Sequence, residues 1–231
     1  MNLVGKYQPA FHRAIMVLDV EHFGDPSRTN LDQLKIRDGL YEALIHAFEN
    51  SGIPWSNCMS EDRGDGALIL VPPEVPKSLL VTKIPAALVD GIRIHNEACP
   101  TQARMRLRMA LHAGEIHRDA HGFAGAAINF TFRLVEAPAL KTALGRSSGV
   151  LSLIVSEWFF EEVVQHDSEA NPLSYRQVDV NIKETQTVAW IRLPDDSAAE
   201  TFPVGAMAEA TPGRSRVTLP VSLAANVSSG S

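Results

Sequence analysis

Two aspartates in this sequence each lie where a short apolar run meets a turn. Asp19 follows the run 14–18, and Asp65 stands between two glycines just before the run 67–71. Each run has the length and composition of a buried strand, and glycine tolerates the positive φ that a tight hairpin turn needs. If the two strands are neighbours, the carboxylates meet at one end of a sheet. There they repel each other unless a divalent cation lies between them, so the pair is a candidate metal site.

A second pair of polar residues falls on a predicted helix. We expect this helix to run from about residue 126 to 136, and it carries Asn129 and Arg133. Residues four apart share one helix face, so both side chains can point into one cleft. Taken alone, this pair would be a solvated helix face, and an aspartate at a strand end is more often a turn former than a ligand. The candidates therefore carry weight only in combination.

The order of the expected strands and helices that must position these residues predicts an α+β domain with helices over a mainly antiparallel sheet. Residues 1–12 form a lead-in, 13–193 the domain, and 194–231 a disordered tail rich in Ala, Ser, Pro, Gly and Thr. Strands are expected at about 13–20, 55–60, 67–71, 104–111, 149–155, 174–180 and 187–193. Helices are expected at about 30–50, 77–98, 126–136 and 156–165, with a short helix after Pro138.

Local signals add detail to this plan. Asn30 has the character of a helix N-cap, Ser156 is expected to cap the last long helix, and residues 113–115 are expected to turn the chain. Arg104, Arg106 and Arg108 alternate with apolar residues, which predicts that the arginines lie on the exposed side of a strand.

The totals exclude several classes of protein. The 231 residues carry a net charge of −6 without a long basic run, which argues against nucleic-acid binding. The apolar runs are too short for a membrane span, and the N-terminus lacks the apolar core of a signal peptide. Cys58 and Cys99 are too few for a disulfide scaffold, so we expect a cytoplasmic protein. His112, His117 and His121 straddle the predicted turn and fit no standard zinc site.

Five segments together resemble the catalytic domain of class III nucleotide cyclases, the family of adenylate and guanylate cyclases. They follow the family's order over about residues 13–193, at positions 16–23, 61–66, 109–115, 127–134 and 180–183. The resemblance implies a ferredoxin-like class III cyclase fold. It also implies conversion of a nucleoside triphosphate to a 3′,5′-cyclic monophosphate and pyrophosphate, for intracellular signalling.

The resemblance assigns roles to the residues that could do chemistry. Asp19, Asp65 and the carbonyl of Val20 would bind two Mg²⁺ or Mn²⁺ ions per site. Arg133 would stabilise charge that grows on the α-phosphate as the 3′-oxygen attacks, and Asn129 would orient the ribose.

Further positions would contact the rest of the nucleotide. Glu61 occupies the base-reading position and matches guanylate cyclases, whereas Gly122 stands where the family usually has a polar partner. Guanine, adenine and a pyrimidine therefore all remain open. Lys183 would hold the terminal phosphates. His22, where the family has a glycine, and Phe23 follow the metal aspartate and are candidate phosphate contacts.

In this family the metal aspartates and the Asn/Arg pair of one site come from opposite subunits. The resemblance thus implies a head-to-tail homodimer with two equivalent sites, and a downstream effector protein is a further expected partner. The pattern departs from the family at Gly122, His22, Gly24 and Glu184, and the first two keep a second interpretation open. In it the chain is a cyclase-homology module without turnover, which binds a nucleotide or a partner protein as a regulatory sensor.

Overall fold

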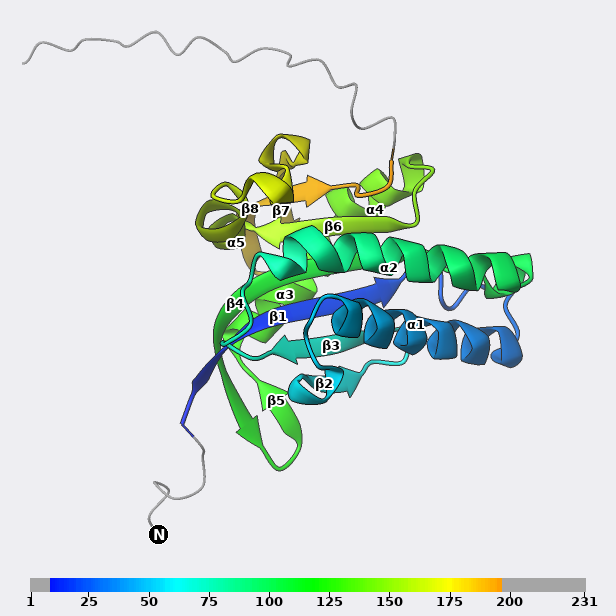
Figure 1. Ribbon diagram of the computed structural model, residues 1–231, viewed down its shortest axis with the longest axis horizontal. Coiled ribbons are helices and arrows are strands. Elements are labelled where there is room, and N and C mark those ends of the chain that lie inside the picture. The colour runs from blue at the N-terminus through cyan, green and yellow to red at the C-terminus, as the bar shows by residue number, and fades with distance from the viewer. Residues whose placement is uncertain (1–8, 197–231) are drawn as a thin grey trace, which may run out of the picture. The chain divides into compact units, whose positions relative to one another are not determined.

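The computed structural model describes residues 9–196, in which one mixed sheet has helices on both of its faces (Figure 1). The strands are β1 (Phe11–Val20), β2 (Met59–Asp62), β3 (Gly66–Val71), β4 (Leu107–Asp119), β5 (Gly122–Ala124), β6 (Leu151–Ser156), β7 (Arg176–Ile182) and β8 (Thr185–Arg192). The helices are α1 (Asn30–Asn50), α2 (Leu79–Ala98), α3 (Ala126–Val135), α4 (Pro138–Arg146) and the short α5 (Glu157–Phe159), which continues as a π-helical turn at Phe160–Val164.

The strands follow the order β2-β3-β1-β4-β6-β8-β7, and β5 pairs with the far end of β4. Every pairing is antiparallel except the one between β4 and β6. The predicted α+β fold with a mainly antiparallel, helix-covered sheet is therefore confirmed.

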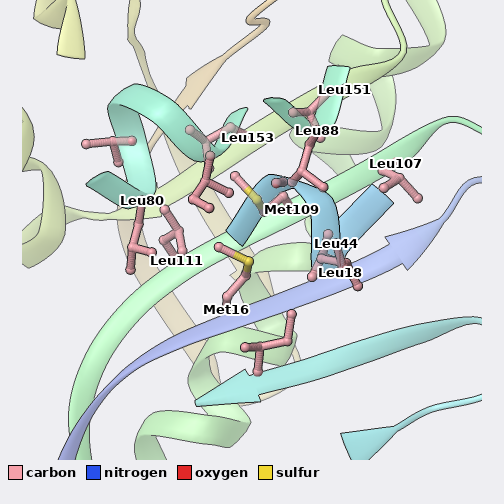
Figure 2. Packing of buried hydrophobic residues seen from close by; sticks show 14 of the residues in the cluster. Met16, Leu18, Leu44, Leu80, Leu88, Leu107, Met109, Leu111, Leu151 and Leu153 are labelled. Carbon is pink, nitrogen blue, oxygen red and sulfur yellow. The ribbon is translucent and has the colours of Figure 1, made fainter. Parts of the chain in front are cut away.

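Strand β1 lies at the centre and faces both halves of the core. Because successive side chains of a strand point to opposite faces, Met16 and Leu18 pack toward α1 and α2, whereas Ile15 and Val17 pack toward α3 and α4. Figure 2 shows the first of these packing regions, with Met16 and Leu18 among the apolar side chains of β4 and α2. Asp19 continues the alternation of Ile15 and Val17, so it belongs to the face that α3 and α4 cover.

The pairing of β1 with β3 fixes where the second aspartate lies. Asp19 is the Cα partner of Gly66, and a Cβ atom at Gly66 would lie only 2.0 Å from the Leu18 carbonyl oxygen. The two strands can thus approach closely only because residue 66 is glycine. The β2–β3 turn, with Asp65, is held against the end of β1.

Several predicted boundaries are wrong for identifiable reasons. The expected turn at 113–115 is absent, because β4 runs on to Asp119 and Gly114 serves close packing against Ala127 rather than a bend. The expected strand at 55–60 begins with a 3₁₀ turn at Trp55–Asn57 and becomes β2 only at Met59.

The helix caps give one correction and one confirmation. The N-cap of α1 is Thr29 rather than Asn30, and it exchanges hydrogen bonds with Asp32 in a capping box. Ser156 does cap the helical turn that follows it, since its hydroxyl accepts from the Phe159 N–H.

The packed part of the chain reaches past Leu193. The side chain of Asp195 is 5% exposed, contacts Arg93 at 3.0 Å, and accepts from the N–H of Val150 at 2.9 Å. The remainder of the predicted disordered tail, residues 197–231, lies outside the described residues. None of the helices in residues 9–196 combines the length and apolar character needed to cross a membrane.

Candidate functional site

The structure brings Asp19 and Asp65 together, as the strand pattern predicted. The Val20 N–H donates to the Asp65 carbonyl oxygen at 2.8 Å, which fixes the β2–β3 turn to the end of β1. Burial raises the pKa of the Asp19 carboxyl above its usual value, and the nearby Asp65 charge raises it further, whereas Arg108 lowers it. The negative charge of Asp65 therefore acts on the Asp19 carboxyl, and a cation shared by the two would relieve this repulsion.

Arg108 is the direct partner of Asp19 on the neighbouring strand. Its Nε donates to Asp19 Oδ2 at 2.5 Å, Nη2 contacts the same oxygen, and only 12% of the side chain is exposed. Arg106 is also engaged, since it bonds Glu21 at 3.2 Å. The prediction of a solvent-exposed strand face is thus wrong for Arg106 and Arg108, whereas Arg104 is exposed but lies before β4 begins. Arg108 lies opposite Asp19 at the end of the strand. A charged side chain can be buried there only when it is paired with the opposite charge.

The oxygen donors at this end suit a hard divalent cation. Arg108 occupies Oδ2 of Asp19, which leaves Oδ1 and the exposed carboxylate of Asp65. Within residues 9–196 no cluster of three or more His, Cys, Asp or Glu side chains could enclose a metal. Two carboxylates without a protein cage are the donor set typical of Mg²⁺ that completes its coordination with substrate phosphates. The residues present fit the predicted metal in that mode.

The loop after β1 places its two predicted contacts differently. His22 is exposed, has a positive φ of 54°, and its carbonyl accepts from the Asp25 N–H at 3.1 Å. Phe23 packs its ring against the core that α1 and α2 cover, and its carbonyl lies 3.4 Å from the Gln33 amide nitrogen. His22 is therefore open to a ligand, whereas the Phe23 ring is used in packing.

Asn129 and Arg133 line one pocket of about 390 Å³ on α3, together with Arg63, Phe123, Phe132 and Glu136. Asn129 is exposed, and the Arg133 side chain is 19% exposed. The Arg133 guanidinium contacts Glu136 at 3.7 Å and Glu184 at 3.4 Å. The structure thus brings the predicted pair into one concave site of a size suited to a small ligand.

Lys183 and Glu184 form the two-residue turn between β7 and β8. Lys183 is exposed and has a positive φ of 52°, as tight hairpin turns require. The contact between Glu184 and Arg133 holds this turn beside α3. Lys183 therefore belongs to the same neighbourhood as the α3 pocket, and its solvent-exposed side chain is free to reach toward an anion.

Glu61 and Gly122 are adjacent, as the base-reading interpretation requires. Glu61 Oε1 accepts from the Phe123 N–H at 3.0 Å, and Oε2 accepts from Arg63 Nη2 at 2.5 Å. A Cβ atom at Gly122 would lie 2.4 Å from Glu61 Oε1. Both oxygens of Glu61 are thus bonded within the chain, and the carboxylate fills the space that a side chain at residue 122 would take.

In the part of the chain that the structure describes, the aspartates and the Asn129/Arg133 pair are not bonded to each other, although Arg63 of the Asp65 turn also lines the α3 pocket. In residues 9–196, no hydrogen bond or ion pair joins Asp19 or Asp65 to Asn129 or Arg133. Two residues that the sequence reasoning missed also emerge, Arg108 and Arg63. Arg108 could have been found as the residue opposite Asp19 once the strands were paired.

Comparison with solved structures places this fold. The guanylyl cyclase Cya2 matches with a TM-score of 0.55 at 13% identity, over 80% of this chain and 92% of that chain. The adenylate/guanylate cyclase/hydrolase from Silicibacter pomeroyi matches with a TM-score of 0.52 at 20% identity, over 81% and 100%. A non-canonical dimeric form of the guanylyl cyclase domain of the RhoGC fusion protein from Blastocladiella emersonii matches with a TM-score of 0.52 at 14% identity, over 80% of this chain and 98% of that chain.

No protein-family model matches the sequence, and no curated protein matches it. The matches to solved structures nevertheless show that the chain has the fold of class III adenylate and guanylate cyclase catalytic domains, as the five sequence segments predicted. At these identities the likeness defines the fold. What the chain does has to be argued from its own residues.

Proposed function

We propose that this protein is a nucleotidyl cyclase that converts a nucleoside triphosphate to a 3′,5′-cyclic monophosphate and pyrophosphate. One observation carries the proposal. In a cyclase fold, the chain places two neighbouring carboxylates, Asp19 and Asp65, at a strand end and a pocket with Asn129 and Arg133 on α3. These are the residue types that phosphoryl chemistry needs, because developing negative charge must be neutralised and the nucleophile must be positioned.

The proposed roles follow from the geometry. Asp19, Asp65 and the Val20 carbonyl would hold two Mg²⁺ or Mn²⁺ ions, which supply Lewis-acid activation of the 3′-hydroxyl and charge neutralisation. Arg133 binds the α-phosphate as the 3′-oxygen attacks phosphorus and the bond to the pyrophosphate oxygen breaks. Asn129 orients the ribose. Lys183 and the exposed His22 contact the outer phosphates.

Substrate binding then amounts to an exchange of ion-pair partners. Arg133 leaves Glu184 for a phosphate oxygen, while Arg108 stays on Oδ2 of Asp19, and Oδ1 with the Asp65 carboxylate would hold the cations. The exchange at Arg133 is possible because Glu184 is exposed and its ion pair is weak, and the guanidinium keeps an anionic partner when phosphate replaces it.

The two halves would complete each other across a head-to-tail homodimer with two equivalent sites. The lack of a bond between the aspartates and Asn129 or Arg133 within the described residues of one chain supports this arrangement. One of the similar structures is a cyclase domain in a non-canonical dimer. The cyclic product would act as a cytoplasmic signal that an effector protein reads.

A second candidate function rests on the same ion pairs. If Arg108 and Glu184 hold Asp19 and Arg133 permanently, the chain is a cyclase-homology module that binds a nucleotide or a partner protein without turnover.

The test is a mass-spectrometric product assay with Mn²⁺ and a mixture of ATP, GTP, CTP and UTP. A cyclic monophosphate that disappears in the Asp65→Ala and Arg133→Ala variants supports the enzyme. Folded wild-type dimer that yields no cyclic product from any of the four supports the module.

A further inference from the structure

Arg63 is a cationic residue of the β2–β3 turn, two residues before Asp65, and it lines the α3 pocket. It follows Glu61 by two residues, at the start of the turn from β2 to β3. Its side chain is 39% exposed, and it lines the same 390 Å³ pocket as Asn129 and Arg133. A guanidinium here is therefore within reach of any ligand that contacts those two residues.

Two contacts hold the Arg63 side chain in place. Nη2 donates to Glu61 Oε2 at 2.5 Å, and the guanidinium carbon lies 5.2 Å from the centre of the Phe132 ring, within the range of cation–π attraction. These contacts use one N–H group and one face of the planar group. The remaining N–H donors have no partner among residues 9–196. Arg63 is thus oriented and still able to donate.

The Glu61 carboxylate, by contrast, has a bonded partner on each of its oxygens. One of its oxygens is bonded to the Phe123 N–H and the other to Arg63. Glycine at residue 122 leaves room for this arrangement, since a Cβ there would meet Glu61 Oε1 at 2.4 Å. Each oxygen of Glu61 thus already accepts one bond, which fixes the carboxylate beside Arg63 and β5, and each keeps a second lone pair.

We infer that Arg63, positioned by Glu61, is the residue that reads the nucleobase, and that it selects a base with carbonyl oxygens over adenine. The inference rests on the proposed nucleotide site. A guanidinium is a planar fork of donors that pairs with adjacent acceptors, as in its bidentate bond to O6 and N7 of guanine. Uracil and cytosine also offer carbonyl oxygens. Adenine has none, and its amino group would face another donor.

The experiment measures binding separately from turnover. The α,β-methylene analogues of ATP, GTP, CTP and UTP, which cannot release pyrophosphate, are titrated calorimetrically with Mn²⁺ into wild-type, Arg63→Met and Arg63→Lys proteins. The lysine variant keeps the charge and the Glu61 ion pair but loses the planar fork. Arg13→Met is the matched control, because Arg13 also lies over a phenylalanine ring, 4.7 Å from that of Phe11, and does not line the pocket.

We expect wild type and Arg13→Met to bind at least one carbonyl-bearing analogue about tenfold or more tightly than the adenine analogue, the discrimination one bidentate pair provides. Both Arg63 variants should lose that ratio while their folding, followed by circular dichroism, is unchanged. An adenine preference in wild type overturns the inference, as does an equal loss for all four analogues in Arg63→Met.

The same samples are assayed for cyclic product from the natural triphosphates. Binding with the expected base ratio but without product leaves the role of Arg63 standing and refutes the proposed catalysis. Product formation without the expected base ratio refutes the role of Arg63 and leaves the proposed catalysis standing. A wild-type protein that binds none of the four analogues overturns both.

Discussion

Arg133 is the residue on which the proposed chemistry depends most, and its guanidinium already has carboxylate partners. Glu184 comes from the β7–β8 turn and contacts it at 3.4 Å, with 72% of its own side chain exposed. A triphosphate has to displace this carboxylate. Because an exposed ion pair is weak, the displacement should hinder binding without preventing it.

We therefore expect Glu184→Gln to lower the KM for the preferred nucleoside triphosphate by about two- to fivefold, the scale of an exposed ion pair, with little change in kcat. Steady-state kinetics on the purified protein measures both constants. Glu74→Gln, in the exposed loop before α2, removes the same charge away from the pocket and should change neither. A KM that does not respond to Glu184→Gln would show that the contact does not compete with substrate.

His112 makes a second prediction at this scale, which concerns stability. Its ring bonds the Ser156 hydroxyl at 2.9 Å and lies edge-on to Phe130, with the ring centres 4.8 Å apart. Burial lowers the pKa of His112 from 6.5 to about 4. The folded protein thus keeps this ring neutral over a range where the unfolded chain binds a proton.

Between pH 6.5 and about 4 the unfolded state binds more protons at His112. The free energy of unfolding should therefore be unaffected by this group above pH 6.5 and fall as the pH drops toward 4, by up to about 3 kcal/mol. Urea titrations at pH 7.5, 6, 5 and 4 measure the slope. The His112→Gln variant should show a shallower pH dependence than wild type, and equal slopes would contradict the assignment.

At the scale of elements, the sequence predicted what depends on local pattern. The buried runs that became β1 and β3, the helix that became α1, and the helix with Asn129 and Arg133 all follow from periodicity and turn residues. What it missed depends on contacts between distant residues. Gly114 is a residue type typical of turns, but its role here is set by its packing against α3, which follows it in the sequence.

The same limit applies to the site. Asp19 and Asp65 could be paired from their positions at strand ends. Arg108 could not be distinguished from Arg104 by alternation alone, because the pattern gives the face of a strand and not what lies opposite it. Arg63 could be identified only once it was known that Glu61 is already bonded on both oxygens. Paired strands would have supplied the first of these facts, and only side-chain geometry the second.

The packing of α3 on β4 yields a prediction for an element. A Cβ atom at Gly114 would lie 2.6 Å from the Cβ of Ala127, so the helix must shift. We expect Gly114→Ala to lower the free energy of unfolding by about 1–3 kcal/mol and to lower kcat, because the displaced helix carries Asn129 and Arg133. Thermal unfolding and kinetics measure the two effects.

The double variant Gly114→Ala with Ala127→Gly is the control, since it moves the methyl group from the helix to the strand and removes the clash. It should recover most of the lost activity, although glycine in a helix costs up to about 1 kcal/mol of stability. Activity that stays as low as in Gly114→Ala would mean that the contact does not set the position of α3.

At the scale of the whole molecule, the proposed site has two parts in each chain. The aspartate end and the α3 pocket are not joined by any hydrogen bond or ion pair in residues 9–196. If two chains combine head to tail, each site takes its aspartates from one subunit and its Asn129 and Arg133 from the other. A two-fold dimer of this kind is isologous, so it closes after two subunits and holds two equivalent sites.

This arrangement predicts that two inactive variants restore each other. Asp65→Ala and Arg133→Ala should each lack activity, and their equimolar mixture should recover about a quarter of the wild-type rate, since half of the dimers are mixed and each has one intact site of two. The mixture of Asp65→Ala with Asp19→Ala is the control and should stay inactive, because both lesions fall in the same part. The product assay of mixed, re-equilibrated subunits measures the recovery. If the first mixture stays as inactive as the control, while size-exclusion chromatography shows that the subunits exchange, each chain must complete its site alone and the shared-site arrangement is wrong.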